Sequence, residues 1–144
     1  MRILGLDLGT KTLGVSVSDN TEMIATGLIT LRFEENKPES TISDLKKIIE
    51  EYDVKKIVIG LPKNMNNTLG FAAERTFKFI DVLKENFDIS IDTQDERLSS
   101  VSANSILLSA DLSRKKRKEK VDEVAAVIIL QNYLDIRKGM NNGK

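Results

Sequence analysis

The hydrophobic period of the chain changes near residue 40, and this change constrains the fold more than any other sequence feature. Before it, apolar residues recur in three short runs, Arg2–Leu8, Thr12–Ser18 and Met23–Phe33. The second run alternates apolar and polar residues, which is typical of a half-buried strand. Gly9–Lys11 is a predicted tight turn, because glycine tolerates the left-handed conformations that turns need. We therefore predict an antiparallel meander of three strands.

After residue 40 the apolar residues recur at helical spacing. The predicted helices cover Ser40–Tyr52, Phe71–Asn86, Ser100–Leu108 and Val121–Arg137. Between them we predict strands at Lys56–Ile59 and Ile89–Asp92, a polar loop at Gly60–Leu69 and a charged connector at Ala110–Lys120. The order predicts an α/β fold with a mixed five-stranded sheet, three antiparallel strands plus two parallel ones, flanked by helices. Residues 1–137 are expected to form one domain and residues 138–144 a flexible tail.

The composition limits the chemistry that the chain can use. Cysteine and histidine are absent, which excludes disulfides, thiolate nucleophiles, the usual zinc sites and a histidine base. Carboxylates remain, and they favour one or two Mg²⁺ or Mn²⁺ ions. The 22 basic and 22 acidic residues cancel, so contact with nucleic acid requires a local basic patch. We find no signal peptide, and the longest apolar run, Val124–Leu130, is too short for a bilayer, so we expect a cytoplasmic protein without membrane contact.

Carboxylates stand at three informative places. Asp7 lies inside the most apolar predicted strand, where aspartate is rare, so it is either a metal ligand at the sheet centre or a cap of the turn at Gly9. Asp95 and Glu96 follow the last predicted strand, where site residues are common, but the pattern does not select between them or exclude a solvated loop. Asp122 begins the last predicted helix, as a ligand or as a charge that favours the helix dipole.

The spacing around Asp122 favours the first role. Its helical neighbours Ala125, Ile129 and Tyr133 place it on the apolar stripe, whereas Glu123 is the exposed neighbour. If the three carboxylates converge, each like-charge pair at ~4 Å costs about 4 kcal/mol at an effective dielectric near 20. A divalent cation offsets that repulsion and supplies the means to hydrolyse a phosphodiester.

Four motifs follow one another along the chain: ILGLDLGTKTLGVSVSD at 3–19, IGLPKNM at 59–65, DERLSS at 95–100 and KVDEVAA at 120–126. They resemble those of the YqgF family, which is RNase H-like and related to the RuvC-type Holliday junction resolvases. The resemblance spans nearly the whole chain. It implies an RNase H-like fold and a metal-dependent nuclease. It departs at Asn66 and Asn67, where the family usually has Asp-Gly, and at Leu69, where an acidic residue is common.

By this resemblance Asp7, Glu96 and Asp122 are the catalytic and metal-binding triad, which selects Glu96 over Asp95. The implied reaction is hydrolysis of precursor rRNA at the 5′ end of pre-16S rRNA, during ribosome biogenesis. Cleavage of branched DNA as a Holliday junction resolvase is the first alternative. A non-catalytic RNA-binding factor in ribosome assembly is the second. Oligomeric state stays open.

Several basic residues are candidates for nucleic-acid binding. Lys11 follows the first turn and Arg97 adjoins Glu96, so both could contact a phosphate, although a solvated lysine and an internal ion pair are comparable readings. The run that ends at Lys120 contains more basic residues, and we expect Arg114, Lys115, Lys116 and Arg117 to contact nucleic acid. Without interleaved aromatic residues this run would bind backbone charge and not base sequence. Neutralising about four phosphates would give log affinity a slope of roughly −3 against log salt.

One further class competes at the first motif. Leu6–Thr10 also resembles the first phosphate loop of actin-like ATPases and sugar kinases. Those enzymes need two such domains, and we find no second block of this kind in the sequence. A P-loop is excluded because Gly9–Thr12 lacks the required spacing. ATP turnover without cleavage of nucleic acid would favour this class.

Overall fold

The computed structural model describes residues 2–35, 37–61, 71–95 and 114–142. Its strands are β1 (Arg2–Leu8), β2 (Thr12–Ser18), β3 (Ala25–Arg32), β4 (Val54–Leu61) and β5 (Ser90–Asp95). They form one five-stranded sheet in the order β3-β2-β1-β4-β5. The pairs β1–β2 and β2–β3 are antiparallel, whereas β1–β4 and β4–β5 are parallel. The predicted mixed sheet is therefore confirmed, with β1 at its centre.

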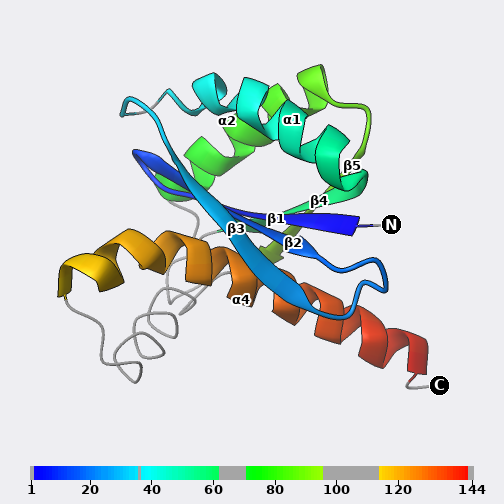
Figure 1. Cartoon of the computed structure of the whole chain (residues 1–144). Coiled ribbons are helices and arrows are strands. Elements are labelled where there is room, and N and C mark those ends of the chain that lie inside the picture. Colours follow the sequence, from blue (N-terminus) through cyan, green and yellow to red (C-terminus); the bar gives the residue numbers. More distant parts are fainter. Residues whose placement is uncertain (1, 36, 62–70, 96–113, 143–144) are drawn as a thin grey trace.

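Helices cover both faces of this sheet. On one side lie α1 (Ile42–Tyr52), which follows the short 3₁₀ helix η1 (Pro38–Thr41), and α2 (Phe71–Asn86). On the other side α4 (Arg114–Asn142) crosses the sheet, running against the direction of β1 (Figure 1). In the part of the chain that the structure describes, no helix is long and apolar enough to cross a membrane.

The two faces carry separate cores. Leu4, Leu6 and Leu8 of β1 pack toward α1 and α2, in a cluster that includes Phe79 and Leu83. Ile3 packs on the opposite side, in a cluster with Val58, Ile129, Leu130 and Leu134. Because side chains alternate along a strand, Gly5 and Asp7 share the face of Ile3, under α4.

Most predicted boundaries differ from the observed ones by a few residues, and two differences affect the site. The last strand reaches Asp95, which pairs with Leu61, whereas the sequence suggested that Asp95 follows the strand. The connector predicted at 110–120 is helical from Arg114, because its lysines, arginines and glutamate are good helix formers and no glycine or proline interrupts them. The helix predicted at 100–108 and most of the loop predicted at 60–69 lie outside the described residues.

The C-terminal helix is also longer than predicted, ending at Asn142 and not at Arg137. The division into a domain at 1–137 and a tail at 138–144 stays a prediction. One prediction about burial was wrong: β2 is not half-buried but buried on both faces. Its polar face, with Ser16 0% and Ser18 1% exposed, lies beneath α4, and both hydroxyls are hydrogen-bonded.

Candidate active site

Asp7 lies near the carboxyl end of the central strand, on the face that α4 covers. It is 8% exposed and pairs in register with Gly14 of β2. Its neighbours on the same face of β1 are Ile3 and Gly5, which are apolar. A carboxylate in such a place loses much of its hydration and needs compensation from charged or polar groups. Asp7 therefore lies at the centre of the sheet, where the sequence predicted it, and its burial makes it a candidate site residue.

The helix approaches β1 very closely beside Asp7. A Cβ atom added at Gly5 would lie 2.4 Å from Ser16 Oγ, 2.7 Å from Leu130 Cβ and 3.2 Å from the Ala126 carbonyl oxygen. Ala125 and Ala126 are 1% and 0% exposed, so the helix presents its smallest side chains here. The Ser16 hydroxyl donates a hydrogen bond of 2.8 Å to the Ala126 carbonyl oxygen. The contact leaves room for neither a larger residue nor a shifted helix.

The other members of the predicted triad are placed only in part. Asp122 belongs to α4, one turn before Ala126, but its side chain lies outside the described residues. Its stripe on the helix does face the sheet, because Ala125 and Ile129 are buried and Tyr133 is half-buried. Glu96 lies just beyond the described end of β5. Among the described side chains, no three acidic residues stand close enough together to hold a metal ion.

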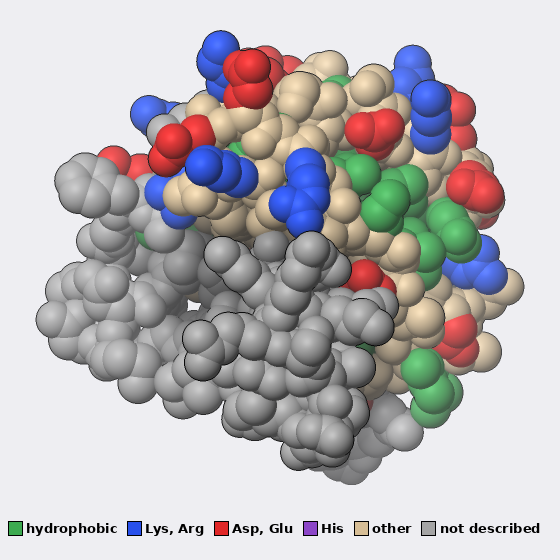
Figure 2. Space-filling model, turned by 60° about the vertical axis from the view of Figure 1, so that its left-hand side comes forward, with side chains coloured by type: hydrophobic (Ala, Val, Ile, Leu, Met, Phe, Trp, Pro, Cys, Tyr) green, Lys and Arg blue, Asp and Glu red, His purple; other side chains and the backbone are tan. Residues whose placement is uncertain are grey.

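The predicted nucleic-acid-binding residues are spread over three segments. Lys11 is exposed in the turn between β1 and β2, where its carbonyl oxygen accepts a 2.9 Å hydrogen bond from the Phe33 amide. Arg97 lies outside the described residues. Arg114–Arg117 form the first turn of α4, with side chains that are not described. Figure 2 shows the molecule with the left-hand side of Figure 1 turned forward, and Lys and Arg side chains are interspersed with Asp and Glu over the described part of this face.

Glu123 is not simply exposed, as the sequence suggested. It is half-buried, and its side chain lies over Gly27 of β3, where an added Cβ would come within 2.5 Å of Glu123 Oε1. Gly27 pairs with Ser16, so this contact extends the close approach of α4 across a third strand.

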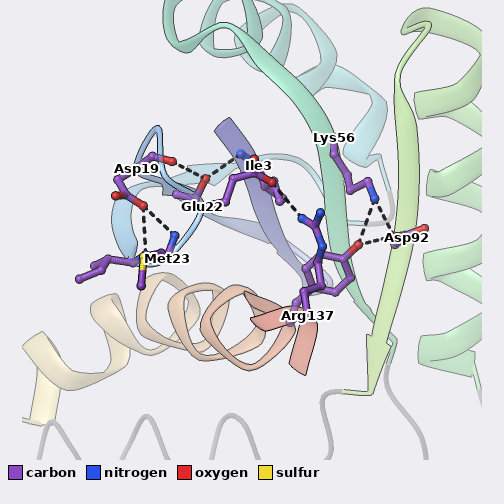
Figure 3. Close-up of polar contacts among 10 residues, drawn as sticks. Ile3, Asp19, Glu22, Met23, Lys56, Asp92 and Arg137 are labelled. Carbon is purple, nitrogen blue, oxygen red and sulfur yellow. Dashed lines mark hydrogen bonds and ion pairs between the residues drawn. The ribbon is translucent and has the colours of Figure 1, made fainter. Parts of the chain in front are cut away.

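The opposite end of the α4 face carries a network of charged side chains (Figure 3). Lys56 Nζ donates to the Tyr133 hydroxyl at 3.2 Å and lies 3.3 Å from Asp92 Oδ2. The Tyr133 hydroxyl donates to Asp92 Oδ2 at 2.5 Å. Arg137 pairs with Glu22 at 2.9 Å, and its guanidinium lies 5.7 Å from the centre of the Tyr133 ring. The network joins the C-terminal half of α4 to β4, β5 and the β2–β3 turn.

Protonation equilibria in this network follow its hydrogen bonds. The bond from Tyr133, and then the contact with Lys56, lowers the pKa of Asp92. The same tyrosine hydroxyl, with support from Asp92, raises the pKa of Lys56. Burial and the bond to Asp92 raise the pKa of Tyr133. At neutral pH Asp92 is therefore ionised, Lys56 is protonated and Tyr133 is neutral, which are the states in which they hydrogen-bond one another.

A pocket of about 170 Å³ adjoins this network and is lined by Arg2, Ile3, Glu22, Lys55, Lys56 and Arg137. Three of its four basic side chains already face carboxylates, since Lys55 also lies 3.0 Å from Asp53. We therefore assign a structural role to the contacts of Tyr133 and Arg137 with Lys56, Asp92 and Glu22. These five residues are called the clamp below.

The turn between β2 and β3 is organised around Asp19. Its carboxylate accepts hydrogen bonds from Thr21 Oγ1 and from the Met23 and Ile24 amides, and these bonds hold the pKa of Asp19 well below its usual range. Glu22 adopts a positive φ of 60° in this turn, from which it reaches Arg137. Gln131 also bonds this region, through the Ala25 amide and the Met23 carbonyl.

Sequence patterns did not reveal the clamp or the contact of Ser16 with the helix. Tyr133 was visible only as a member of the apolar stripe, and Asp92 only as the end of a strand. The one available signal was the polar face of β2, where serines stand at alternate positions of an otherwise apolar strand.

Solved structures define the class of fold. The *Thermus thermophilus* RuvC structure in complex with a Holliday junction superposes with a TM-score of 0.58 at 13% identity, covering 96% of this chain and 97% of that one. The fowlpox virus resolvase in complex with junction DNA also gives 0.58, at 12% identity and with 95% and 99% coverage. The fold is therefore that of the RNase H-like resolvases, as predicted.

Sequence comparison identifies the family. A family model described as "RuvX: Holliday junction resolvase" matches residues 1–136. The chain belongs to this family, and the predicted relation to YqgF proteins is confirmed.

Curated relatives match along almost their whole length. A *Geobacillus* protein is 49% identical over 138 residues, which cover 96% of this chain and 100% of that protein. A *Clostridium acetobutylicum* protein is 51% identical over 135 residues, with 94% and 98% coverage. Both carry the name "Putative pre-16S rRNA nuclease".

Proposed function

We propose that this protein is a divalent-metal-dependent nuclease that hydrolyses phosphodiester bonds, with Asp7, Glu96 and Asp122 as its metal-binding and catalytic carboxylates. One observation carries the proposal. Asp7 is buried on the sheet face beneath the helix that contains Asp122, two residues from Gly5, where that helix packs closely on the strand.

The direction of packing supports bringing Asp122 toward Asp7. Ile3 packs with Leu134 and Ile129, whereas Gly5 meets Ala126 and Leu130, so moving forward along β1 corresponds to moving backward along α4. From Gly5 to Asp7 the strand advances about 6.6 Å. From Ala126 to Asp122 the helix retreats about 6 Å. The two steps match, which favours a shared site at the carboxyl end of β1.

The available donors suit a hard cation. They are carboxylate oxygens, in a chain without histidine or cysteine, and these favour Mg²⁺ or Mn²⁺ over zinc. Asp7, Glu96 and Asp122 would hold one or two such ions. A bound ion would supply an activated water and stabilise the leaving oxygen of the phosphodiester. Asp7 contributes a rigidly placed ligand, because its strand is central and its face is covered by α4.

The basic run at the start of α4 is proposed to hold the substrate. Arg114, Lys115, Lys116 and Arg117 belong to the same helix as Asp122, so phosphates bound there lie along the approach to the site. Lys11, exposed in the turn that follows β1, and Arg97 are proposed as further phosphate contacts. Replacing the four residues of the run by glutamine should reduce the slope of log affinity against log salt by roughly 3.

For the substrate we favour precursor rRNA, at the 5′ end of pre-16S rRNA, because the curated relatives near 50% identity carry that name. Branched DNA is the second candidate, favoured by the family description and by the fold shared with resolvases. A cytoplasmic location follows from either substrate in a bacterial cell.

The decisive experiment compares cleavage of a precursor rRNA fragment and of a four-way DNA junction by the wild-type chain, with Mg²⁺, with Mn²⁺ and with chelator. We expect metal-dependent cleavage of the RNA, abolished in Asp7→Asn. Preferential cleavage of the junction would reassign the substrate. Binding of RNA without cleavage under any metal would overturn the nuclease proposal in favour of a non-catalytic assembly factor.

A further inference from the structure

We propose that Ser16 is a positioning residue for the metal site. Its hydroxyl fixes where α4 sits along β1 and β2, one helical turn from Asp122, and so sets the separation between Asp122 and Asp7. This inference rests on the proposed function.

Ser16 has the contacts that such a role requires. It is 0% exposed, and its Oγ donates to the Ala126 carbonyl oxygen at 2.8 Å, whereas the Gly5 carbonyl oxygen lies at 3.5 Å. Around this bond the packing between sheet and helix is apolar, and apolar packing does not specify position along the helix axis as a directional hydrogen bond does. Gln131, Tyr133 and Arg137 also tie α4 to the sheet, but they lie farther from Asp122.

The close approach at Gly5 makes the site sensitive to this bond. A Cβ built on Gly5 would lie 2.7 Å from Leu130 Cβ and 3.2 Å from the Ala126 carbonyl oxygen, so α4 packs closely on the backbone of β1. A displacement of α4 is therefore transmitted directly to the turn that contains Asp122. Metal–ligand distances tolerate only about ±0.2 Å. A displacement of α4 along its axis by much less than the rise of one residue would therefore weaken the proposed site.

Ser18 provides a matched control. It lies on the same strand and the same face and is 1% exposed. Its Oγ accepts a hydrogen bond from the Ile3 amide at 2.8 Å and donates to the Asp19 carbonyl oxygen at 3.0 Å. Ser18→Ala therefore removes an equally buried hydroxyl that bonds the strands and their turn, whereas Ser16→Ala removes one that bonds the helix.

The test measures Mn²⁺ affinity of the full chain by titration calorimetry, together with amide hydrogen exchange in residues 123–130. We expect Ser16→Ala to raise the Mn²⁺ dissociation constant by about tenfold, the size typical of residues that orient a metal ligand. It should also accelerate exchange in that part of α4. Ser18→Ala should leave both quantities close to wild type, even though it lowers the melting temperature.

Gly5→Ala tests the same point by steric pressure. The added methyl would push α4 outward, so Mn²⁺ binding should weaken at least as much as in Ser16→Ala. Equal Mn²⁺ constants for the two serine variants, or unchanged exchange in Ser16→Ala, would overturn the role of Ser16. Failure of the wild-type chain itself to bind Mn²⁺ would instead overturn the metal-dependent nuclease.

Discussion

The described contacts of α4 near Gly5 and near its C-terminal end differ in how they involve charged groups. In the C-terminal half, Lys56, Asp92 and Tyr133 satisfy one another, and Arg137 pairs with Glu22. In the N-terminal half the helix lays small residues on Gly5, and the strand beneath it carries a carboxylate, Asp7, among apolar neighbours. Opposite charges matched within one network stabilise a fold. A buried carboxylate loses hydration and depends on polar or charged groups, which in the proposed function include a divalent cation.

The C-terminal contacts hold α4 on the sheet, whereas the N-terminal part of the helix carries a residue of the proposed site. The C-terminal contacts involve groups that are partly exposed, with Lys56 and Asp92 side chains 29% and 45% accessible, so each is worth little alone. Together they anchor the helix through several strands. The N-terminal contacts are tighter and less polar, which suits a part of the helix that must place one residue accurately.

The largest difference in cleavage activity should appear between two variants, each of which lacks one carboxylate, at opposite ends of the face that α4 covers. Asp7→Asn should reduce metal-dependent cleavage by well over the ~100-fold limit typical of residues that only orient ligands. Asp92→Asn, the same change within the clamp, should leave most activity. Initial rates at saturating Mn²⁺ test this, and comparable losses in both variants would erase the distinction between the two ends.

The same two variants should also differ in melting temperature when no metal is present. Asp7→Asn should leave the melting temperature in chelator unchanged or raised, because in the proposed triad it relieves repulsion among the three carboxylates. Asp92→Asn should lower it, because Tyr133 and Lys56 lose a charged acceptor. A clear drop in Asp7→Asn would show that Asp7 is a structural, hydrogen-bonded residue.

Two glycines under α4 should differ in their tolerance of a methyl group. At Gly5 the added carbon meets Ser16 Oγ and Leu130 Cβ, which cannot withdraw, so Gly5→Ala should cost about 1–3 kcal/mol of unfolding free energy. At Gly27 it meets the Glu123 side chain, which can turn aside, so Gly27→Ala should cost less than about 1 kcal/mol. Urea denaturation measures both, and a reversed order would contradict the packing described here.

Within the clamp, Tyr133→Phe should be a milder change. It keeps the ring and removes the hydroxyl that bridges Lys56 and Asp92, so we expect a loss of about 1 kcal/mol. Cleavage should be retained. A strong loss of activity with little loss of stability would show that the clamp also adjusts the site.

The smallest effect concerns acid stability at the β2–β3 turn. The folded state lowers the pKa of Asp19, so the stability it contributes is present above the ordinary aspartate pKa of about 3.9 and is lost as pH falls below that value. Asp19→Asn should lower the melting temperature slightly at pH 7, where the ionised carboxylate contributes, and flatten the acid limb of the profile below about pH 4, where the two proteins converge. An unchanged acid limb would contradict the hydrogen bonds assigned to this carboxylate.

The sequence predicted the mixed sheet because its periods are strong: alternation before residue 40 indicated an antiparallel meander, and helical spacing after it indicated two strands joined through helices. It also predicted the helical stripe on which Asp122 lies. It failed at Arg114–Lys120, where charge suggested an irregular connector although the same residues favour a helix. It also missed the bond from Ser16 to α4, because a serine facing a buried partner looks in sequence like one that faces water, and it missed the hydroxyl contacts of Tyr133, because the spacing showed only that its ring belongs to the apolar stripe.

The central place of β1 limits how the site can be regulated. Flanked by β2 and β4, β1 cannot fray from an edge, so its amides should open only when the whole sheet does. A ligand, partner or mutation that alters the proposed site should therefore act on elements other than β1. Asp7 is fixed by the topology of the sheet, whereas Asp122 lies on one long helix whose position depends on its packing contacts.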